Sequence, residues 1–420
     1  MSSGDIATSA AHAAESAARR SYGKLVAFLA SRTRDVAAAE DALSAAFESA
    51  LRDWPASGVP ASPEAWLLTA ARRSMIDAAR RRRTHDAAAP DLLLFADLAT
   101  DDTEQRAIPD DRLLLMFACA HPAIDRSVRA PLMLQTILGF DAASIASAFL
   151  VAPSAMGQRL VRAKTKIKQA GIPFRLPDAD DLQERLDSVL EAIYASFTEG
   201  WSDGAGTDAR RRNLAEEGIW LGRLVAALLP AEPEALGLLA LMLHAQARRA
   251  ARRDANGDYV PLAEQDPDAW DHALIDEAEA LLHRASALGA IGRYQLEAAV
   301  QSAHVVRRLT GQADWAAIVQ LYDALLALTG SPVVALNRSI AIAEIRGAQA
   351  GLAALDAIDA LTKEPRFADY QPYWAARAGL LERAGQVGAA DDAYRRAIGL
   401  EADPAVRRFL QQRRDRLPAS

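Results

Sequence analysis

Helical periodicity is the feature that most restricts the fold of this chain. Over almost all of its 420 residues, apolar residues recur at intervals of three and four, and Ala and Leu are frequent. No window alternates between apolar and polar residues as a half-buried strand does, and Pro and Gly mark the breaks between helices. The sequence therefore predicts an all-α protein. Its length exceeds one ordinary hydrophobic core, so two or three domains are expected.

The breaks divide the chain into three helical blocks. We expect domains at residues 9–83, 111–176 and 182–420, with a polar linker at 84–110. Near the C-terminus, several residues fall at the small and large positions of a tetratricopeptide helix pair: Ala378, Leu381, Gly385, Ala390, Tyr394, Ala397 and Pro404. An earlier stretch is similar but looser, with Gly347 in the place of Gly385. The last block is therefore predicted to be an α-solenoid-like helical-repeat domain, an architecture that usually binds partners.

The charge is unevenly distributed. The net charge of −7 combines +1 over residues 1–180 with −8 over the remainder. Two short stripes are strongly basic: Arg72 to Arg83 holds six Arg against one Asp, and Arg159 to Arg175 holds six basic residues and no acid. Such stripes in a neutral domain favour a shaped contact with phosphates, although each could also be a solvated helix face.

Residues 125–171 have the pattern of a helix-turn-helix. The first helix is expected to end at Gly139, Asp141 to cap the second, and a basic helix to follow a short turn. An apolar stripe on that last helix comprises Met156, Leu160, Ala163 and Ile167. The side chains expected to face DNA lie away from the stripe or at the start of the helix: Ser154, Gln158, Arg159, Arg162 and Lys166. Gln suits adenine, Arg suits guanine and Lys suits phosphate, but a generic amphipathic helix has the same division of faces.

The sequence offers little for catalysis or for a bound metal. Cys119 is the only cysteine and lies two residues before His121, which is too few ligands for zinc, so a core cysteine is expected. Gly-rich phosphate loops and nucleophile elbows are lacking. We therefore expect no enzymatic activity, no cofactor and no metal. Without an apolar run of roughly 18 residues or a secretory signal, the expected location is the cytoplasm, with no membrane association.

Three segments together carry a family resemblance. They are AEDALSAAF, AWLLTAARRSMIDAARRRR and IASAFLVAPSAMGQRLVRAKTKIK. They resemble the extracytoplasmic-function group of the sigma-70 family, and the long tail resembles a branch with a tetratricopeptide-like helical extension. The resemblance implies two small sigma helical domains, the second a helix-turn-helix, in front of the repeat domain. The implied partners are core RNA polymerase, promoter DNA in double-stranded and locally melted form, and a protein partner of the repeat domain.

The resemblance also implies a role for particular residues. Polymerase binding would involve Glu40, Asp41, Phe47 and Trp54. Contact with the minus-ten element would involve Trp66, Arg72, Arg73, Arg80, Arg81 and Arg82. The helix-turn-helix residues would read the minus-thirty-five element. Trp54 and Trp66 could instead be core residues.

The sequence departs from the family pattern at two places, and one alternative function stays open. The recognition helix opens with Ala152, Pro153, Ser154 and Ala155 in place of a Pro, acid, Pro, Thr series, and Thr198 stands where the extension usually has Asn. The alternative is a helical-repeat scaffold or signalling protein that uses sigma-like domains only for docking. We further expect the acidic repeat domain to modulate the sigma domains within the same chain.

Overall fold

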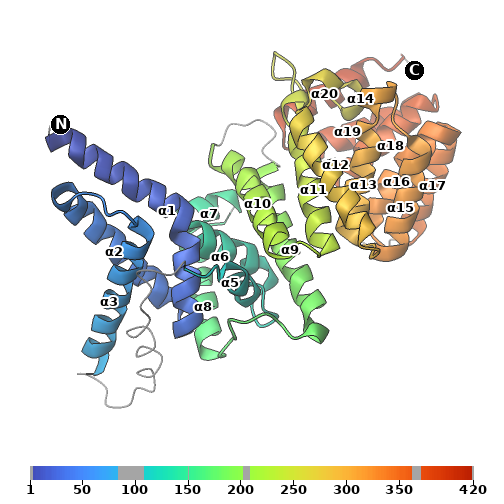
Figure 1. Ribbon diagram of the computed structural model, residues 1–420. Helices are drawn as coiled ribbons and strands as arrows, with labels where there is room; N and C mark the ends of the chain where they lie inside the picture. Colours follow the sequence, from blue (N-terminus) through green and yellow to red (C-terminus); the bar gives the residue numbers. More distant parts are fainter. Residues whose placement is uncertain (1–2, 84–107, 150, 202–208, 362–369, 419–420) are drawn as a thin grey trace. The chain divides into compact units, whose positions relative to one another are not determined.

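The computed structural model describes residues 3–83, 108–149, 151–201, 209–361 and 370–418 (Figure 1). These segments are almost entirely helical. Strand-like pairing within them is limited to an isolated bridge between Arg253 and Tyr259. The predicted all-α fold class is therefore confirmed. Among the helices of the described segments, none has the length and apolar character needed to cross a membrane.

Three long helices form the N-terminal part of the chain. They are α1 (Ser3–Thr33), α2 (Val36–Ser57) and α3 (Pro63–Arg83). The three helices pack against one another (Figure 1) and bury Phe28, Leu43 and Leu67 completely between them. Helix α2 begins where it does because the Asp35 carboxylate accepts a hydrogen bond from the backbone N–H of Ala38, at 3.0 Å.

Shorter helices follow and belong to the same compact unit. They are α5 (Arg112–Cys119), α6 (Arg126–Leu138), α7 (Ala142–Ala148), α8 (Pro153–Gln169) and α9 (Ala179–Trp201). Helix α9 packs on α5 and α6, where Arg185 donates a hydrogen bond of 2.7 Å to the carbonyl of Phe117 and Arg126 pairs with Glu191. The unit also includes Arg210–Gly218, at the start of α10 (Ala209–Leu228). The domain start expected at residue 182 thus falls inside α9, and contacts group α9 with the preceding helices.

Helices α1 and α6 approach each other very closely at one residue. A Cβ atom added to Gly23 of α1 would lie 2.1 Å from the carbonyl oxygen of Ile137 in α6. A side chain cannot fit at that distance, so glycine is required for the two backbones to meet. This contact ties the N-terminal three-helix group to the helices that follow it.

The second compact unit extends from Ile219 to the C-terminus and is also helical. After the last part of α10, its α-helices are α11 (Pro233–Ala247), α12 (His272–Ala287), α13 (Arg293–Val305), α14 (Arg307–Thr310), α15 (Trp315–Thr329), α16 (Pro332–Arg346), α17 (Ala348–Leu361), α18 (Gln371–Arg383), α19 (Val387–Leu400) and α20 (Pro404–Asp415). Short 3₁₀ helices occur at η1 (Ala250–Arg252), η2 (Leu262–Glu264) and η3 (Pro267–Ala269). Neighbours along the chain pack pairwise, as in α15 with α16, α16 with α17, and α18 with α19. This is the arrangement expected of an α-solenoid.

The two glycines matched in the sequence occupy equivalent places in this unit. Gly347 ends α16 with φ +86°, and Gly385 follows α18 with φ +74°. Both backbones are in the region that favours glycine; α17 follows Gly347 directly, and α19 follows Gly385 after Gln386. Of the other residues in the repeat pattern, Ala378, Ala390 and Tyr394 are buried in the core around α18 and α19. The sequence pattern therefore located the turns and the core of these pairs correctly.

Candidate nucleic-acid interface

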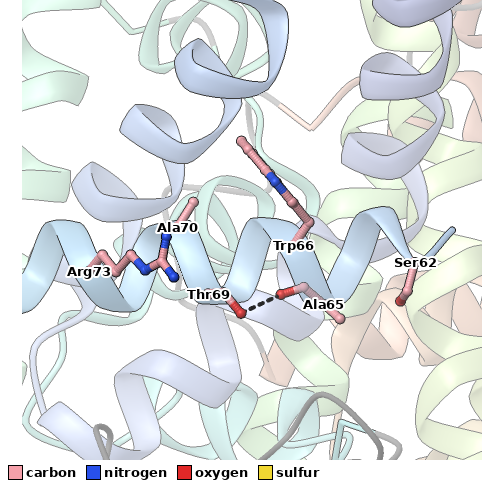
Figure 2. A pocket seen from close by; sticks show the side chains of 6 residues that line it. All are labelled: Ser62, Ala65, Trp66, Thr69, Ala70 and Arg73. Carbon is pink, nitrogen blue, oxygen red and sulfur yellow. Dashed lines mark hydrogen bonds between the residues drawn. The ribbon is translucent and has the colours of Figure 1, made fainter. Parts of the chain in front are cut away.

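A hollow of about 390 Å³ lies along α3 (Figure 2). It is lined by Ser62, Ala65, Trp66, Thr69, Ala70 and Arg73. The Trp66 ring packs edge-on against Trp54, with ring centroids 5.4 Å apart and planes at 69°. The Arg73 side chain is exposed, and the Thr69 hydroxyl donates a hydrogen bond of 2.9 Å to the carbonyl of Ala65. The hollow thus combines an indole with a guanidinium, the two kinds of group that hold single-stranded nucleic acid.

The neighbouring arginine faces the protein interior. Arg72 is buried, and its guanidinium carbon lies 5.2 Å from the centre of the Phe28 ring. Successive helix residues point about 100° apart, so Arg72 and Arg73 reach different surroundings although they are adjacent in sequence. The structure therefore brings Trp66 and Arg73 together and separates Arg72 from them. Arg80, Arg81 and Arg82 fall in the last turn of α3, and their side chains lie outside the described residues.

Helices α6, α7 and α8 form the helix-turn-helix that the sequence predicted. Gly139 ends α6 in the left-handed conformation, with φ +76°. The Asp141 carboxylate accepts hydrogen bonds from the backbone N–H and the hydroxyl of Ser144, at 2.8 and 2.7 Å, and so caps α7. Pro153 occupies the first turn of α8, where its missing N–H has no cost. The predicted end of α6 and the predicted cap of α7 are confirmed, whereas α8 begins at Pro153, inside the stretch expected as the turn.

The two faces of α8 also agree with the sequence pattern. The apolar stripe is buried against the neighbouring helices and consists of Met156, Leu160, Ala163 and Ile167. Four of the residues expected to face DNA are exposed, namely Ser154, Gln158, Arg162 and Lys166, while Arg159 is half-buried. A Cβ atom added to Gly157 would have no neighbour within 4 Å, so packing does not require glycine at this position.

A second hollow, of about 440 Å³, lies between the start of α6 and α8. Arg159, Arg162 and Lys166 line one side of it, and Asp125 and Ser127 line the other. The Asp125 carboxylate accepts hydrogen bonds from Ser127, which lower its pKa, with a smaller contribution from Arg159. Three cations against one carboxylate leave this hollow electropositive, as a phosphate site requires.

Helix α8 is attached to α2 by two ion pairs that the sequence did not predict. Lys164 Nζ lies 2.6 Å from Glu40 Oε2, and Lys168 Nζ lies 2.7 Å from Asp35 Oδ2. The first pair is largely buried, with side-chain exposures of 12% and 11%, whereas Lys168 is about half exposed. Burial raises the pKa of the Glu40 carboxyl above its ordinary value, and Lys164 opposes that rise. Two residues of the second basic stripe, Lys164 and Lys168, therefore form ion pairs with carboxylates of the same chain.

The residues expected to bind polymerase are spread over different environments. Asp41 is exposed and Phe47 is half-buried, so both are accessible. Glu40 is buried in its pair with Lys164, and Trp54 is 1% exposed in the core. In this arrangement, Asp41 and Phe47 are the members of the set that a partner can reach.

Cys119 is a core residue, as the sequence indicated. Its thiol is fully buried, lies 3.6 Å from the Thr136 hydroxyl, and has its pKa raised to about 12 by burial. His121 lies just after the end of α5, where its Nδ1 accepts a hydrogen bond from the backbone N–H of Ala123 at 3.1 Å. Over the part of the chain that the structure describes, no three His, Cys, Asp or Glu side chains gather as metal ligands would.

Comparison with known proteins adds an independent line of evidence. Residues 18–85 match sigma-70 region 2, and residues 185–286 match a family of unknown function (DUF6596). An uncharacterized protein of Rhizobium meliloti (strain 1021) is 39% identical over 394 residues, which are 92% of this chain and 91% of the relative. No solved structure matches. The first match covers the second half of α1 and all of α2 and α3, and it includes the residues that line the Trp66 and Arg73 hollow.

Proposed function

We propose that the chain is a promoter-specificity factor of the sigma-70 family, in its extracytoplasmic-function group, because residues 18–85 match sigma-70 region 2. It would bind core RNA polymerase in the cytoplasm and direct it to particular promoters, while the polymerase performs the chemistry. The observation that carries the proposal is the position of the region 2 match, which falls on the helices around the hollow of Trp66 and Arg73. The first test is co-elution of the full chain with core polymerase on a sizing column; separate elution would count against the proposal.

The hollow on α3 is the proposed seat for a base of the melted minus-ten element. An unpaired base can stack on an indole, and a guanidinium beside it holds the adjacent phosphate. Trp66 and Arg73 supply these two groups within one hollow. Arg72 would contribute from behind, by packing on Phe28 and holding α3 in place.

Replacing Arg73 by glutamine is expected to reduce promoter melting about tenfold and to leave the stability of the fold unchanged, because the side chain is exposed. A hydrogen bond to a charged group contributes about 1.5–3 kcal/mol. Arg72→Gln is the matched comparison: its main effect should be on stability, since Arg72 is buried. Melting is followed by the fluorescence of 2-aminopurine placed in the minus-ten element, and stability by thermal unfolding. Equal melting with Arg73→Gln and the unmodified chain would remove this hollow from the mechanism.

Helix α8 is the proposed reader of the minus-thirty-five element. Gln158 and Arg162 are exposed and suit base edges in the major groove, while Lys166 and Arg159 border the electropositive hollow and suit phosphates. Ser154, exposed at the N-terminal turn, is a further candidate for a phosphate contact. The Ala152–Ala155 opening of the helix provides fewer polar groups than the family pattern, so base reading would rest on Gln158 and Arg162.

Replacing Lys166 by glutamine is expected to lower the salt dependence of DNA binding. One lost phosphate contact reduces the slope of log affinity against log salt concentration by about 0.9. Arg175→Gln is the matched control, because Arg175 is exposed after the end of α8 and pairs with Asp178. The slope is measured by fluorescence anisotropy of a duplex between roughly 50 and 200 mM salt. A slope that Lys166→Gln leaves unchanged would exclude Lys166 from phosphate binding.

We further propose that the C-terminal unit modulates the N-terminal helices within the same chain, either by masking DNA contacts or by supporting their geometry. Deletion of the unit distinguishes the two, since masking predicts tighter DNA binding and support predicts lost activity. The position of the cut matters. A cut after Pro177 would remove α9, whose Arg185 and Glu191 hold α5 and α6. A cut after Leu228, at the end of α10, keeps the whole first unit.

A further inference from the structure

A cavity in the C-terminal unit has no role in the proposed function. It has a volume of about 610 Å³, is partly open to solvent, and is bordered by α13, α15, α16 and the segment around η2 and η3. This volume is within the range of pockets that hold small molecules. All of its lining residues belong to the second compact unit.

The cavity wall is aromatic. Trp315 and Tyr322 line it from α15, and Trp270 lines it from the end of η3. The rings are held in place: His304 packs edge-on against Trp315 with centroids 5.3 Å apart, and the Arg307 guanidinium lies 5.3 Å from the centre of the Trp270 ring. Fixed indole and phenol rings favour a flat apolar ligand over a flexible aliphatic one.

Two cations beside the cavity are held only by neutral oxygens. Arg307, which lines it, donates hydrogen bonds of 2.9 Å to the carbonyls of Leu262 and Ala263 and a further one to Gln265. Arg248, at the end of α11, does not itself line the cavity but donates from Nη2 to the side-chain oxygen of Gln301, which does. Neither guanidinium is paired with a carboxylate among the residues that the structure describes.

One terminal nitrogen of the Arg248 guanidinium makes no hydrogen bond within the described residues. This nitrogen, Nη1, is buried. Leaving such a donor unpaired in the interior is costly. The surroundings are electropositive, because Arg248 and Arg307 both add to the effect of burial in lowering the pKa of His304 to about 4. His304 is therefore neutral near pH 7 and available as a hydrogen-bond partner.

The acids near the cavity do not cancel this charge. Glu344 lines the cavity but is paired with Arg383, and Glu297, which faces Tyr322, is paired with Arg293 at 2.7 Å. Each of these carboxylates is thus neutralised by an arginine of its own. The positive charge of Arg248 and Arg307 is left for a ligand.

We propose that this cavity binds a planar aromatic carboxylate, with its ring against Trp270 and Trp315 and its carboxylate on Arg248. The carboxylate would displace the Gln301 amide oxygen and meet both terminal nitrogens of the guanidinium, a bidentate pairing that a single amide oxygen cannot supply. The second unit is then a sensor for a small organic anion, carried on the same chain as the sigma helices. Asn337, half-buried in the cavity wall, is a further donor to the ligand.

The test is calorimetric titration of the full chain with 2-naphthoate and with 2-naphthamide, its neutral counterpart of the same shape. Naphthoate is expected to bind at least about tenfold more tightly than naphthamide, since charge-assisted hydrogen bonds are roughly twice as strong as neutral ones. Arg248→Gln should remove this preference, and Asn337→Trp should fill the cavity and abolish binding of both compounds. Arg284→Gln is the control, because it removes a charge from the exposed end of α12.

Equal affinity of the unmodified chain for the two compounds would overturn the proposal. So would unchanged binding to Asn337→Trp, or failure of naphthoate to bind at millimolar concentration. Binding of a short peptide with a C-terminal Trp carboxylate, without binding of naphthoate, would assign the cavity to a protein partner instead. If Arg248→Gln does not fold, the comparison of the two compounds on the unmodified chain and on Asn337→Trp still decides. These titrations contain no polymerase, so a negative result would not bear on the proposed function in transcription.

Discussion

Replacing Lys164 by methionine is expected to lower the free energy of unfolding by about 3–5 kcal/mol near pH 7, the usual cost of removing one partner from a buried ion pair. The variant keeps the volume of the side chain but leaves the Glu40 carboxylate buried without its cation. Lys168→Met is the matched control, because Lys168 is about half exposed and its pair with Asp35 should contribute no more than about 1 kcal/mol. The measurement is urea unfolding, with hydrogen exchange of the α8 amides as a local readout.

The effect of Lys164→Met should depend on pH in a defined direction. Burial raises the pKa of Glu40, so the folded chain binds more protons than the unfolded chain just above the ordinary value of 4.5. The protonated Glu40 therefore contributes stability below pH 4.5, and this stability is lost as the pH rises from 4.5 through the raised pKa of the folded chain. Without Lys164 the pKa rises further, and the penalty should be large at pH 7 and small near pH 4.5.

A second substitution separates charge from packing at this pair. In the double variant Glu40→Gln with Lys164→Met, neither charge is buried, and most of the lost stability should return. A penalty of Lys164→Met below about 1 kcal/mol at pH 7, or one that does not change with pH, would show that the α2–α8 contact does not exist in solution.

Replacing Gly23 by alanine is expected to destabilise the first unit by about 1–3 kcal/mol or more, because the added methyl group forces α1 away from α6. The new Cβ would lie 2.1 Å from the Ile137 carbonyl oxygen, a backbone atom that cannot rotate away. Gly157→Ala is the matched control: it makes the same change on α8 in open space, where helix propensity predicts stabilisation by up to about 1 kcal/mol. Thermal unfolding of the two variants measures the difference. Similar melting temperatures for both would contradict the close approach of α1 and α6.

Local features of the fold were predictable from the sequence, and the contact between α2 and α8 was not. The stop at Gly139, the cap at Asp141 and the apolar stripe of α8 follow from rules that act within one or two helical turns. Glu40 and Lys164 are 124 residues apart, and nothing in either local pattern indicates that they meet. The sequence therefore described Lys164 only as part of a basic stripe.

The predicted DNA contacts show the same limit at single residues. Arg72 and Arg73 are equivalent in a basic stripe, but one is buried and the other exposed. Helical periodicity could have predicted that Arg72 is buried, because Arg72 lies four residues after Leu68 and three before Met75, which are both buried. The alternative that Trp54 is a core residue is confirmed, and the same spacing supports it, since Trp54 lies four residues after the buried Ala50. The extent of the first unit beyond residue 182 depends on long-range contacts of α9 and had no local signal.

The central claim is that this chain starts transcription at specific promoters, and reconstituted transcription tests it most directly. Core polymerase, the full chain and sheared genomic DNA from the source cells are incubated with nucleotides, and the 5′ ends of the products are sequenced. The proposed function predicts discrete start sites that require the chain and whose products fall about tenfold with Arg73→Gln. Absence of chain-dependent start sites, with a folded chain bound to polymerase, would contradict it and favour a scaffold that uses its sigma helices only for docking.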